Sequence, residues 1–281
     1  MDPAPILSSA VVAAVVAGLI SWFRERQVLD HKADVDYRSN ARKRLYEAIG
    51  PLRLQLLFAA RDVVDRLSGH LRDAVPSGPG WNMDVRGYYV QSFIYRMLRP
   101  LAIGQLIQRQ MSIADFAVDT GALDLLRFDH IAGRMLTGDE ITRDHTAADW
   151  SYQTDHLFRD NLRVAAGTLI ANGAGKEARI VDFAEFVEIL RREGTPTALD
   201  DLFTIFGRCQ GSLLENPIFW LRLVGYGSAC NRLLASQGKD LGFHVRPYDS
   251  VEMLRHAKDE SIATNPGDYA RVFDVVAREG M

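Results

Sequence analysis

Residues 6–23 read ILSSAVVAAVVAGLISWF, eighteen consecutive residues without a charge, and Arg24-Glu25-Arg26 follow at once. Eighteen helical residues rise about 27 Å, close to the roughly 30 Å thickness of a bilayer core. In lipid the backbone polar groups must bond within the segment, so a run of this length forms a helix there. The indole of Trp22, at the end of the run, suits the headgroup boundary. Residues 1–23 are therefore predicted to be a transmembrane anchor.

This run has two other interpretations. A cleaved signal peptide has a positively charged start and a small-residue cleavage site, whereas this chain starts Met1-Asp2-Pro3 and leaves the run through Trp22-Phe23-Arg24. A buried helix of a soluble core is the remaining interpretation, but such helices rarely run for eighteen residues without a charge. Both fit the sequence less well than an anchor.

The charges on either side of the run predict its orientation. Asp2 is the only charged side chain before it, and seven basic residues follow it within the next 21 positions: Arg24, Arg26, Lys32, Arg38, Arg42, Lys43 and Arg44. Basic residues stay on the cytoplasmic side of a membrane, so we expect the N-terminus outside and the C-terminal domain in the cytoplasm. Arginine greatly outnumbers lysine, as in proteins from GC-rich bacterial genomes, which suggests the plasma (inner) membrane of a bacterium.

Small residues recur at every fourth position of the run. One row is Ser9, Ala13, Ala17 and Ser21, and the next is Ala10, Ala14 and Gly18. Such rows let two helix backbones approach closely in lipid. The lipid bilayer and a second copy of the chain are therefore the expected partners, beside an unknown protein partner.

Beyond the anchor, the pattern is helical almost throughout. Residues 24–49 lack Gly and Pro and are predicted to form a juxtamembrane helical stalk, which Gly50-Pro51 should break or kink. Apolar residues at helical spacing then recur through a cytosolic helical domain, 50–281, in the segments 52–74, 88–111, 123–135, 150–171, 199–206, 217–234 and 269–276. Only 178–181 and 242–245 suggest short extended pieces. The predicted fold class is all-α, with an irregular multi-helix domain.

Two helix starts carry local signals. Asp182 and Glu185 have the spacing of a capping box, and Asn216-Pro217 places an N-cap residue before a proline in the first turn.

The composition argues against several classes of function. A net charge of −3 over 281 residues gives no general attraction to nucleic acid. Cys209 and Cys230 lie in apolar stretches without paired histidines, so we expect neither a disulfide nor a zinc site. No cofactor or metal motif is present.

Three arginines in apolar helices are the candidate buried charges or ligand contacts. Arg96 and Arg99 lie on the polar side of the 88–111 helix, and Arg222 stands between two leucines of the 217–234 helix. These charges also argue against further membrane crossings, because each costs about 2.5–3.5 kcal/mol at bilayer depth. Ion pairing with a neighbouring helix is the favoured interpretation, and binding of an anionic ligand is the alternative.

Two patterns suggest catalysis weakly. Arg26 and His31 have the arginine–four–histidine spacing of ribonucleases with the helical HEPN fold, but Gln27 replaces the usual Asn, Asp or His, and the pair lies on a charged stalk. Asp144-His145 and Asp155-His156 place histidines beside carboxylates, yet eleven residues of helix would set them about three turns apart. We expect them to be surface histidines.

Several short pieces together resemble a known group of proteins. They are 41–47 (ARKRLYE), Pro51-Leu52, Gly80-Trp81, 87–89 (GYY), Tyr95-Arg96 and 99–102 (RPLA). The combination resembles uncharacterised bacterial proteins with one N-terminal membrane anchor and a cytosolic α-helical domain. The resemblance covers about the first 120 residues and implies architecture and compartment without any catalytic residue.

These observations favour a non-enzymatic, membrane-anchored helical module for binding or assembly. Two alternatives remain: an effector that perturbs the membrane, for instance in antiviral defence, and a membrane-tethered nuclease or hydrolase.

Overall fold

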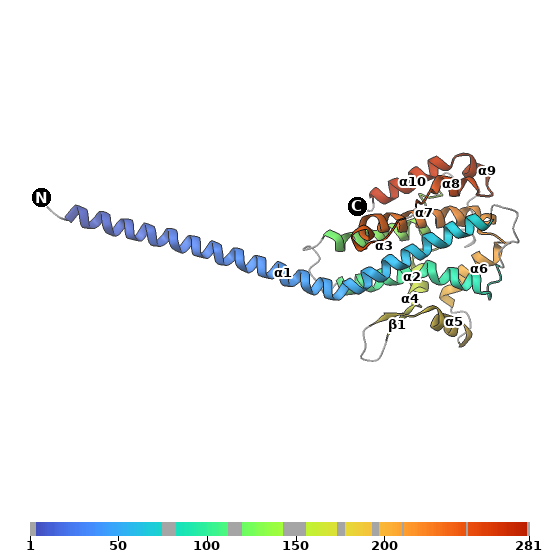
Figure 1. Ribbon diagram of the computed structural model, residues 1–281, viewed down its shortest axis with the longest axis horizontal. Coiled ribbons are helices and arrows are strands. Elements are labelled where there is room, and N and C mark those ends of the chain that lie inside the picture. Colours follow the sequence, from blue (N-terminus) through green and yellow to red (C-terminus); the bar gives the residue numbers. More distant parts are fainter. Residues whose placement is uncertain are drawn as a thin grey trace.

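A single helix, α1 (Ala4–Ala74), accounts for a quarter of the chain and gives the molecule its shape (Figure 1). The computed structural model describes residues 4–74, 83–111, 120–142, 156–172, 178–192, 197–209, 211–245 and 247–279; within these ranges the side chains of 4–13, 15, 19, 20, 74, 120, 197 and 240 are not described. At 1.5 Å per residue, 71 residues extend about 106 Å.

The first half of α1 stands away from the rest of the protein (Figure 1). Every described side chain before Ala41 is exposed, and Leu45 is the first that is buried. Apolar side chains on this part face solvent, among them Val28 and Leu29, which are 65% and 59% exposed. Leu45 and Ile49, in the last part of the predicted stalk 24–49, are buried against the domain, so from here on the stalk means residues 24–44.

Of the two predicted outcomes at Gly50-Pro51, a break or a kink, the structure shows no break, because α1 continues through Pro51. Proline removes one intrahelical hydrogen bond and crowds the preceding turn. Buried residues on both sides, Ile49 before and Leu56 and Leu57 after, hold the two halves against the core. Figure 1 shows α1 changing direction as it reaches the domain, as proline in a helix commonly causes.

Most side chains of the predicted anchor, Ile6 to Phe23, lie outside the described set, although the backbone there is helical. Among the residues that are described, none of the helices offers a stretch both long and apolar enough to cross a bilayer.

The domain is built on four helices packed side by side: the second half of α1, α2 (Tyr88–Met111), α3 (Thr120–Thr137) and α7 (Pro217–Leu233) (Figure 1). Helix α7 is central, because residues 218–227 are all buried. Gly227 allows its close approach to α1, since a Cβ at this position would lie 2.7 Å from Leu67 Cδ1.

Shorter elements surround this core. Helices α4 (Arg159–Gly167), α5 (Phe183–Arg192) and α6 (Asp200–Arg208) cover α2, and α8 (Ser250–Arg255), α9 (Glu260–Thr264) and α10 (Pro266–Glu279) lie on the α7 side (Figure 1). Four short turns complete the described elements: η2 (Thr197–Leu199), η3 (Leu213–Glu215), the π-helical η4 (Leu234–Gly238) and η5 (Lys239–Leu241).

Strand pairing in the described chain is confined to β1 (Ile170–Ala171) and β2 (Arg179–Ile180), which are antiparallel with Ile170 opposite Ile180. The all-α prediction is thus confirmed in its coarse form. The expected helix over 150–171 is wrong at its end, because Ile170 and Ala171 form a strand. The extended piece at 178–181 is confirmed, and no strand forms at 242–245.

Both predicted helix starts are confirmed. Asp182 Oδ1 accepts from the Glu185 N–H at 2.8 Å, and the Glu185 carboxylate accepts from the Asp182 N–H at 2.9 Å, which completes the capping box of α5. Asn216 Oδ1 accepts from the Phe219 N–H at 3.0 Å at the start of α7.

Candidate ligand site

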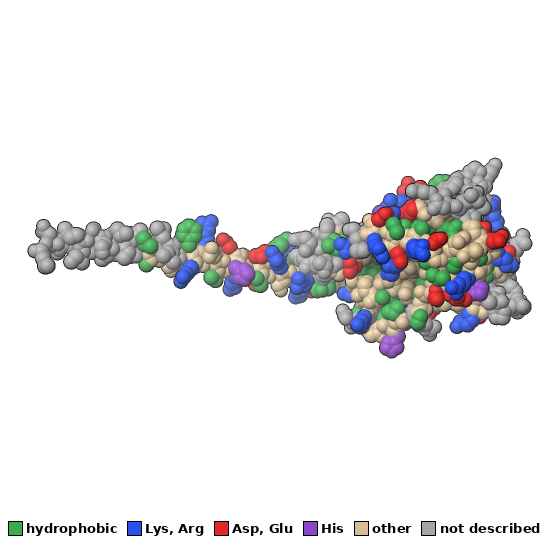
Figure 2. Space-filling model, turned by 90° about the horizontal axis from the view of Figure 1, so that it is seen from above, with side chains coloured by type: hydrophobic (Ala, Val, Ile, Leu, Met, Phe, Trp, Pro, Cys, Tyr) green, Lys and Arg blue, Asp and Glu red, His purple; other side chains and the backbone are tan. Residues whose placement is uncertain are grey.

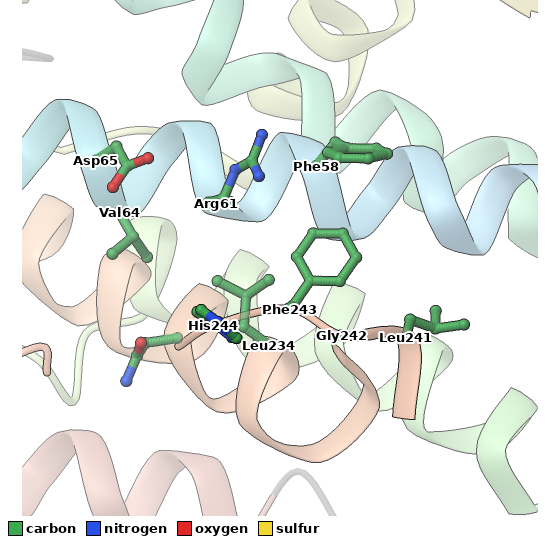
Figure 3. Close-up of a pocket in the computed structure, with 10 residues that line it drawn as sticks. Phe58, Arg61, Val64, Asp65, Leu234, Leu241, Gly242, Phe243 and His244 are labelled. Carbon is green, nitrogen blue, oxygen red and sulfur yellow. The ribbon is translucent and has the colours of Figure 1, made fainter. Parts of the chain in front are cut away.

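A cavity of about 560 Å³ opens between α1 and the chain that follows α7 (Figure 3). Phe58, Arg61, Val64 and Asp65 form the α1 wall, because residues three, four and seven apart share one face of a helix. The opposite wall consists of Asn231 and Leu234, with residues 241–244 at the mouth. This volume lies within the range of about 300–1,000 Å³ that is usual for small-molecule sites.

The opposite wall depends on how the chain leaves α7. The helix passes through the π-helical turn η4 and the 3-10 turn η5, then reverses at Gly242, whose φ of 75° lies in the left-handed region. Phe243 N–H donates to Gly238 O at 3.0 Å, and a Cβ at Gly238 would lie 3.0 Å from Phe243 Cβ. π-Helical turns are uncommon and frequently occur at functional sites.

Two phenyl rings and one guanidinium meet at the mouth of the cavity. The rings of Phe58 and Phe243 lie 5.1 Å apart, and the Arg61 guanidinium lies 5.1 Å from the first and 5.8 Å from the second. Such cation–π contacts orient an arginine without using its N–H groups. Within the described part of the chain Arg61 forms no hydrogen bond or ion pair, so its N–H groups remain available.

Asn231, which lines the cavity, carries a buried acceptor. The side-chain oxygen of Asn231 is buried and accepts no hydrogen bond from any described residue. Leaving a buried acceptor unsatisfied costs about 1–3 kcal/mol, so such an atom calls for a donor. The cavity wall thus carries the exposed Arg61 cation, the Asp65 carboxylate and apolar side chains, whereas the Asn231 oxygen is buried away from solvent.

The arginines that the sequence singled out do not line this cavity. Arg99 donates to Asp62 of α1, with Nη1 to Oδ2 at 3.3 Å. Arg96 forms no ion pair among the described residues and lies near Arg66 instead. Burial, and then the positive charge of Arg96, lower the pKa of Arg66, which donates to Ser92 Oγ at 2.6 Å.

Arg222 is 1% exposed and is bound by neutral acceptors. Its Nη1 donates to Leu136 O at 3.1 Å and Gly138 O at 2.9 Å, at the C-terminal end of α3, where helix carbonyls lack partners and carry partial negative charge. Its Nη2 contacts Thr142 Oγ1 at 3.3 Å and His156 Nδ1 at 3.2 Å. Arg222 thus joins α7 to the end of α3.

The remaining sequence candidates do not form an enclosed site. His156 is half-buried against Arg222 and is not the surface histidine that was expected, whereas Asp144, His145 and Asp155 lie outside the described residues. Arg26 and His31 are exposed on the stalk, and the Arg26 guanidinium lies 5.4 Å from the Trp22 ring.

Of the small-residue rows, the described side chains are exposed: Ala14, Ala17, Gly18 and Ser21. A Cβ at Gly18 would meet nothing within 4 Å. Ser9, Ala10 and Ala13 lie outside the described side chains.

Sequence reasoning missed His70, which is 1% exposed and joins three elements. Its Nε2 accepts from the Leu213 N–H at 3.0 Å, so we assign the proton to Nδ1, which lies 2.6 Å from Tyr89 Oη. Burial, with a smaller contribution from the nearby Arg66 cation, lowers the pKa of His70 to about 4. Ser212 Oγ lies 3.2 Å from Nε2, but this nitrogen already accepts a backbone hydrogen bond. The arrangement is a structural junction.

Sequence reasoning also missed Arg61, Asn231 and residues 241–244. Of these residues, only Gly242 could have been found from the sequence, because glycine often marks a place where the chain reverses. The other residues meet across long separations in sequence, which no local pattern reveals.

On the face that Figure 2 shows, described side chains of both charges are interspersed over the domain and along the stalk. Comparisons of the chain with family models, with curated proteins and with solved structures found no match.

Proposed function

We propose that this chain is a single-pass membrane protein that holds a helical binding and assembly module at the inner face of a bacterial plasma membrane, without enzymatic activity of its own. One observation carries the proposal: α1 leaves the domain as a lone helix and continues into the uncharged run at 6–23. A lone helix with exposed apolar residues is poorly stabilised in water, whereas an apolar helix of this length is stable in lipid.

The stalk then acts as a spacer. Leu45, the first buried residue, lies 22 residues beyond Phe23, which corresponds to about 33 Å of helix. The basic residues at 24–44 favour the cytoplasmic side for the domain, and the N-terminus outside.

Membrane extraction tests the anchor. After cell breakage the full-length protein is expected to sediment with the membranes. It should stay in the membrane fraction after extraction with alkaline carbonate, and only detergent should bring it into solution. Val12→Arg combined with Val16→Arg places two charges at bilayer depth and should release the protein. Val28→Arg adds a charge to the exposed stalk of the same helix and should leave the protein in the membrane. Full-length wild-type protein in the soluble fraction would refute the proposal.

Self-association through the small-residue rows is the second part of the proposal. Replacement of Ala14 and Gly18 by Leu should reduce the yield of crosslinked dimers in membranes, because bulky side chains keep the backbones apart. Ala33→Leu, on the exposed stalk, is the matched control. Only monomers in the wild-type sample would refute assembly by this route.

Cells that express the wild type and these variants also distinguish the two alternative functions. Entry of an impermeant dye upon expression, abolished by Val12→Arg with Val16→Arg, would favour a membrane-perturbing effector. A nuclease activity that His31→Ala removes would favour the tethered enzyme, although an exposed pair on a lone helix gives this alternative little support.

A further inference from the structure

The basic side chains of the stalk differ in whether an acidic side chain pairs with them. Arg38 Nε lies 3.1 Å from Asp34 Oδ2, which is the usual pairing of residues four positions apart on an exposed helix. Lys43 lies 4.0 Å from Glu47 in the same way. Arg24 follows the uncharged run directly, is exposed, and forms neither a hydrogen bond nor an ion pair with any residue that the structure describes. Its positive charge is therefore unpaired within that part of the chain.

Arg26 is directed back toward the uncharged run. Its guanidinium lies 5.4 Å from the centre of the Trp22 ring, which is four positions earlier on the same helix and half exposed. Asp30 stands four positions later, at a spacing that allows pairing, but no ion pair joins it to Arg26 in the described structure. Side chains of an α-helix lean toward its N-terminus, so a long side chain readily takes this direction. Arg26 and Trp22 thus form one exposed unit at the end of the run.

The proposed anchor places this unit at one depth of the bilayer. With residues 6–23 across the hydrocarbon core, Trp22 lies at the inner boundary of the core, which indole rings prefer. Arg26 lies three residues beyond Phe23, about 4.5 Å along the helix, and Arg24 is closer still. Both guanidinium groups then reach the layer of lipid headgroups. Headgroups of this leaflet carry excess negative charge and attract basic side chains next to a membrane helix.

Ionic screening favours Arg24 and Arg26 over the basic residues farther along the stalk. At physiological ionic strength, charges that are more than about 8 Å apart in solvent are largely screened from each other. Arg42 and Arg44 have the same spacing but lie 18 residues, about 27 Å, farther from the run. Glu25 stands between the first two arginines, so this short segment carries one net positive charge into the headgroup layer.

We propose that Arg24 and Arg26 hold the headgroup of an anionic phospholipid beside the Trp22 ring at the inner face of the membrane. This lipid preference rests on the proposed anchor and adds the class of lipid that the anchor selects, a headgroup with net negative charge over a zwitterionic one. Charge complementarity favours this partner, because two unpaired guanidinium groups next to an apolar span attract negative charge in the adjoining headgroups.

Native mass spectrometry of the full-length protein in detergent tests this preference with two probes that differ in headgroup charge. Dioleoyl phosphatidylglycerol is anionic, whereas dioleoyl phosphatidylcholine has the same acyl chains and a zwitterionic headgroup. The anionic lipid is expected to bind about fivefold more tightly, which is the effect of one net basic charge near an anionic membrane surface. Equal affinity for the two lipids would overturn the proposal.

Variants of residues 24–26 locate the site. Arg24→Gln combined with Arg26→Gln should abolish the preference for phosphatidylglycerol, whereas Glu25→Gln should increase it by removing the opposing charge. Arg42→Gln combined with Arg44→Gln is the matched control. It makes the same change in charge at the same spacing, outside the headgroup layer, and should leave the preference unchanged. An equal loss in both double variants, or an unchanged preference in the first, would overturn the assignment.

Flotation distinguishes this lipid preference from the anchor itself. The wild type and the double variant at Arg24 and Arg26 should both float with vesicles of phosphatidylcholine alone, because the apolar run inserts without anionic lipid. Flotation of a wild type that shows no preference for phosphatidylglycerol would overturn the headgroup site and leave the anchor in place. Wild-type protein that floats with no vesicle would refute the anchor, and with it the headgroup site.

Discussion

At the residue scale, His70 makes stability depend on pH. Its pKa falls from 6.5 to about 4 on folding, so between these values the unfolded chain binds the proton more readily. The free energy of unfolding should therefore fall as pH drops from 6.5 to 4, by roughly 3 kcal/mol from this group at about 1.4 kcal/mol per pKa unit.

Urea unfolding at pH 7 and pH 4.5 checks this dependence. His70→Gln should be less stable at pH 7 and should lose less stability on acidification than the wild type. His31→Gln, on the exposed stalk, should behave as the wild type. An unchanged pH dependence in His70→Gln would show that other groups cause the acid sensitivity.

Arg222 gives a second prediction at this scale. Arg222→Met leaves the carbonyls of Leu136 and Gly138 without their buried donor, so it should lower the free energy of unfolding by about 2–4 kcal/mol. Arg232→Met, on the same helix, breaks an exposed ion pair with Asp274 and should cost less than about 1 kcal/mol. Similar urea midpoints for the two variants would contradict a structural role for Arg222.

At the element scale, one part of α1 is packed against the domain and another part is exposed to solvent. Residues 56–67 pack on the core, whereas the side chains of residues 24–40 are all exposed. Helices that are not packed on a core are marginally stable in water. Hydrogen exchange of the full-length protein in detergent should therefore be fast at 24–40 and slow at 56–67. Equal protection of both segments would mean that a partner covers the stalk. Hydrogen exchange measured on the Val35→Asp variant would then show whether that partner contacts the apolar side chains of the stalk.

At the scale of the whole molecule, the proposed anchoring makes the stalk the spacer between membrane and domain. Deletion of residues 27–40 removes fourteen helical residues and should bring the domain about 21 Å closer to the bilayer. Energy transfer between a membrane dye and a label on Arg278→Cys should rise accordingly. Replacement of the same residues by a helical sequence of equal length should leave the transfer unchanged, and a deletion without effect would argue against an upright stalk.

Local sequence signals predicted the helices well, and they failed where contacts with residues distant in sequence determine the local structure. The capping box at Asp182 and the cap at Asn216 are confirmed because each depends on residues three apart. Of the predicted break or kink at Pro51, the break does not occur, because packing on both sides of the proline outweighs its local penalty, and α1 changes direction instead. Ile170 joins a strand because Ile180, ten residues later, pairs with it.

The sequence by itself determined that the chain is helical and begins with a long uncharged run, because periodicity, caps and hydropathy are properties of neighbouring residues. Only the tertiary structure decided that Arg222 ends on the carbonyls of α3, that His70 joins three elements, and that Arg61 and Asn231 face one cavity. Arg222 meets Leu136 and Gly138 across 86 and 84 positions, and His70 meets Leu213 across 143, so these contacts follow from how the helices pack rather than from any local pattern.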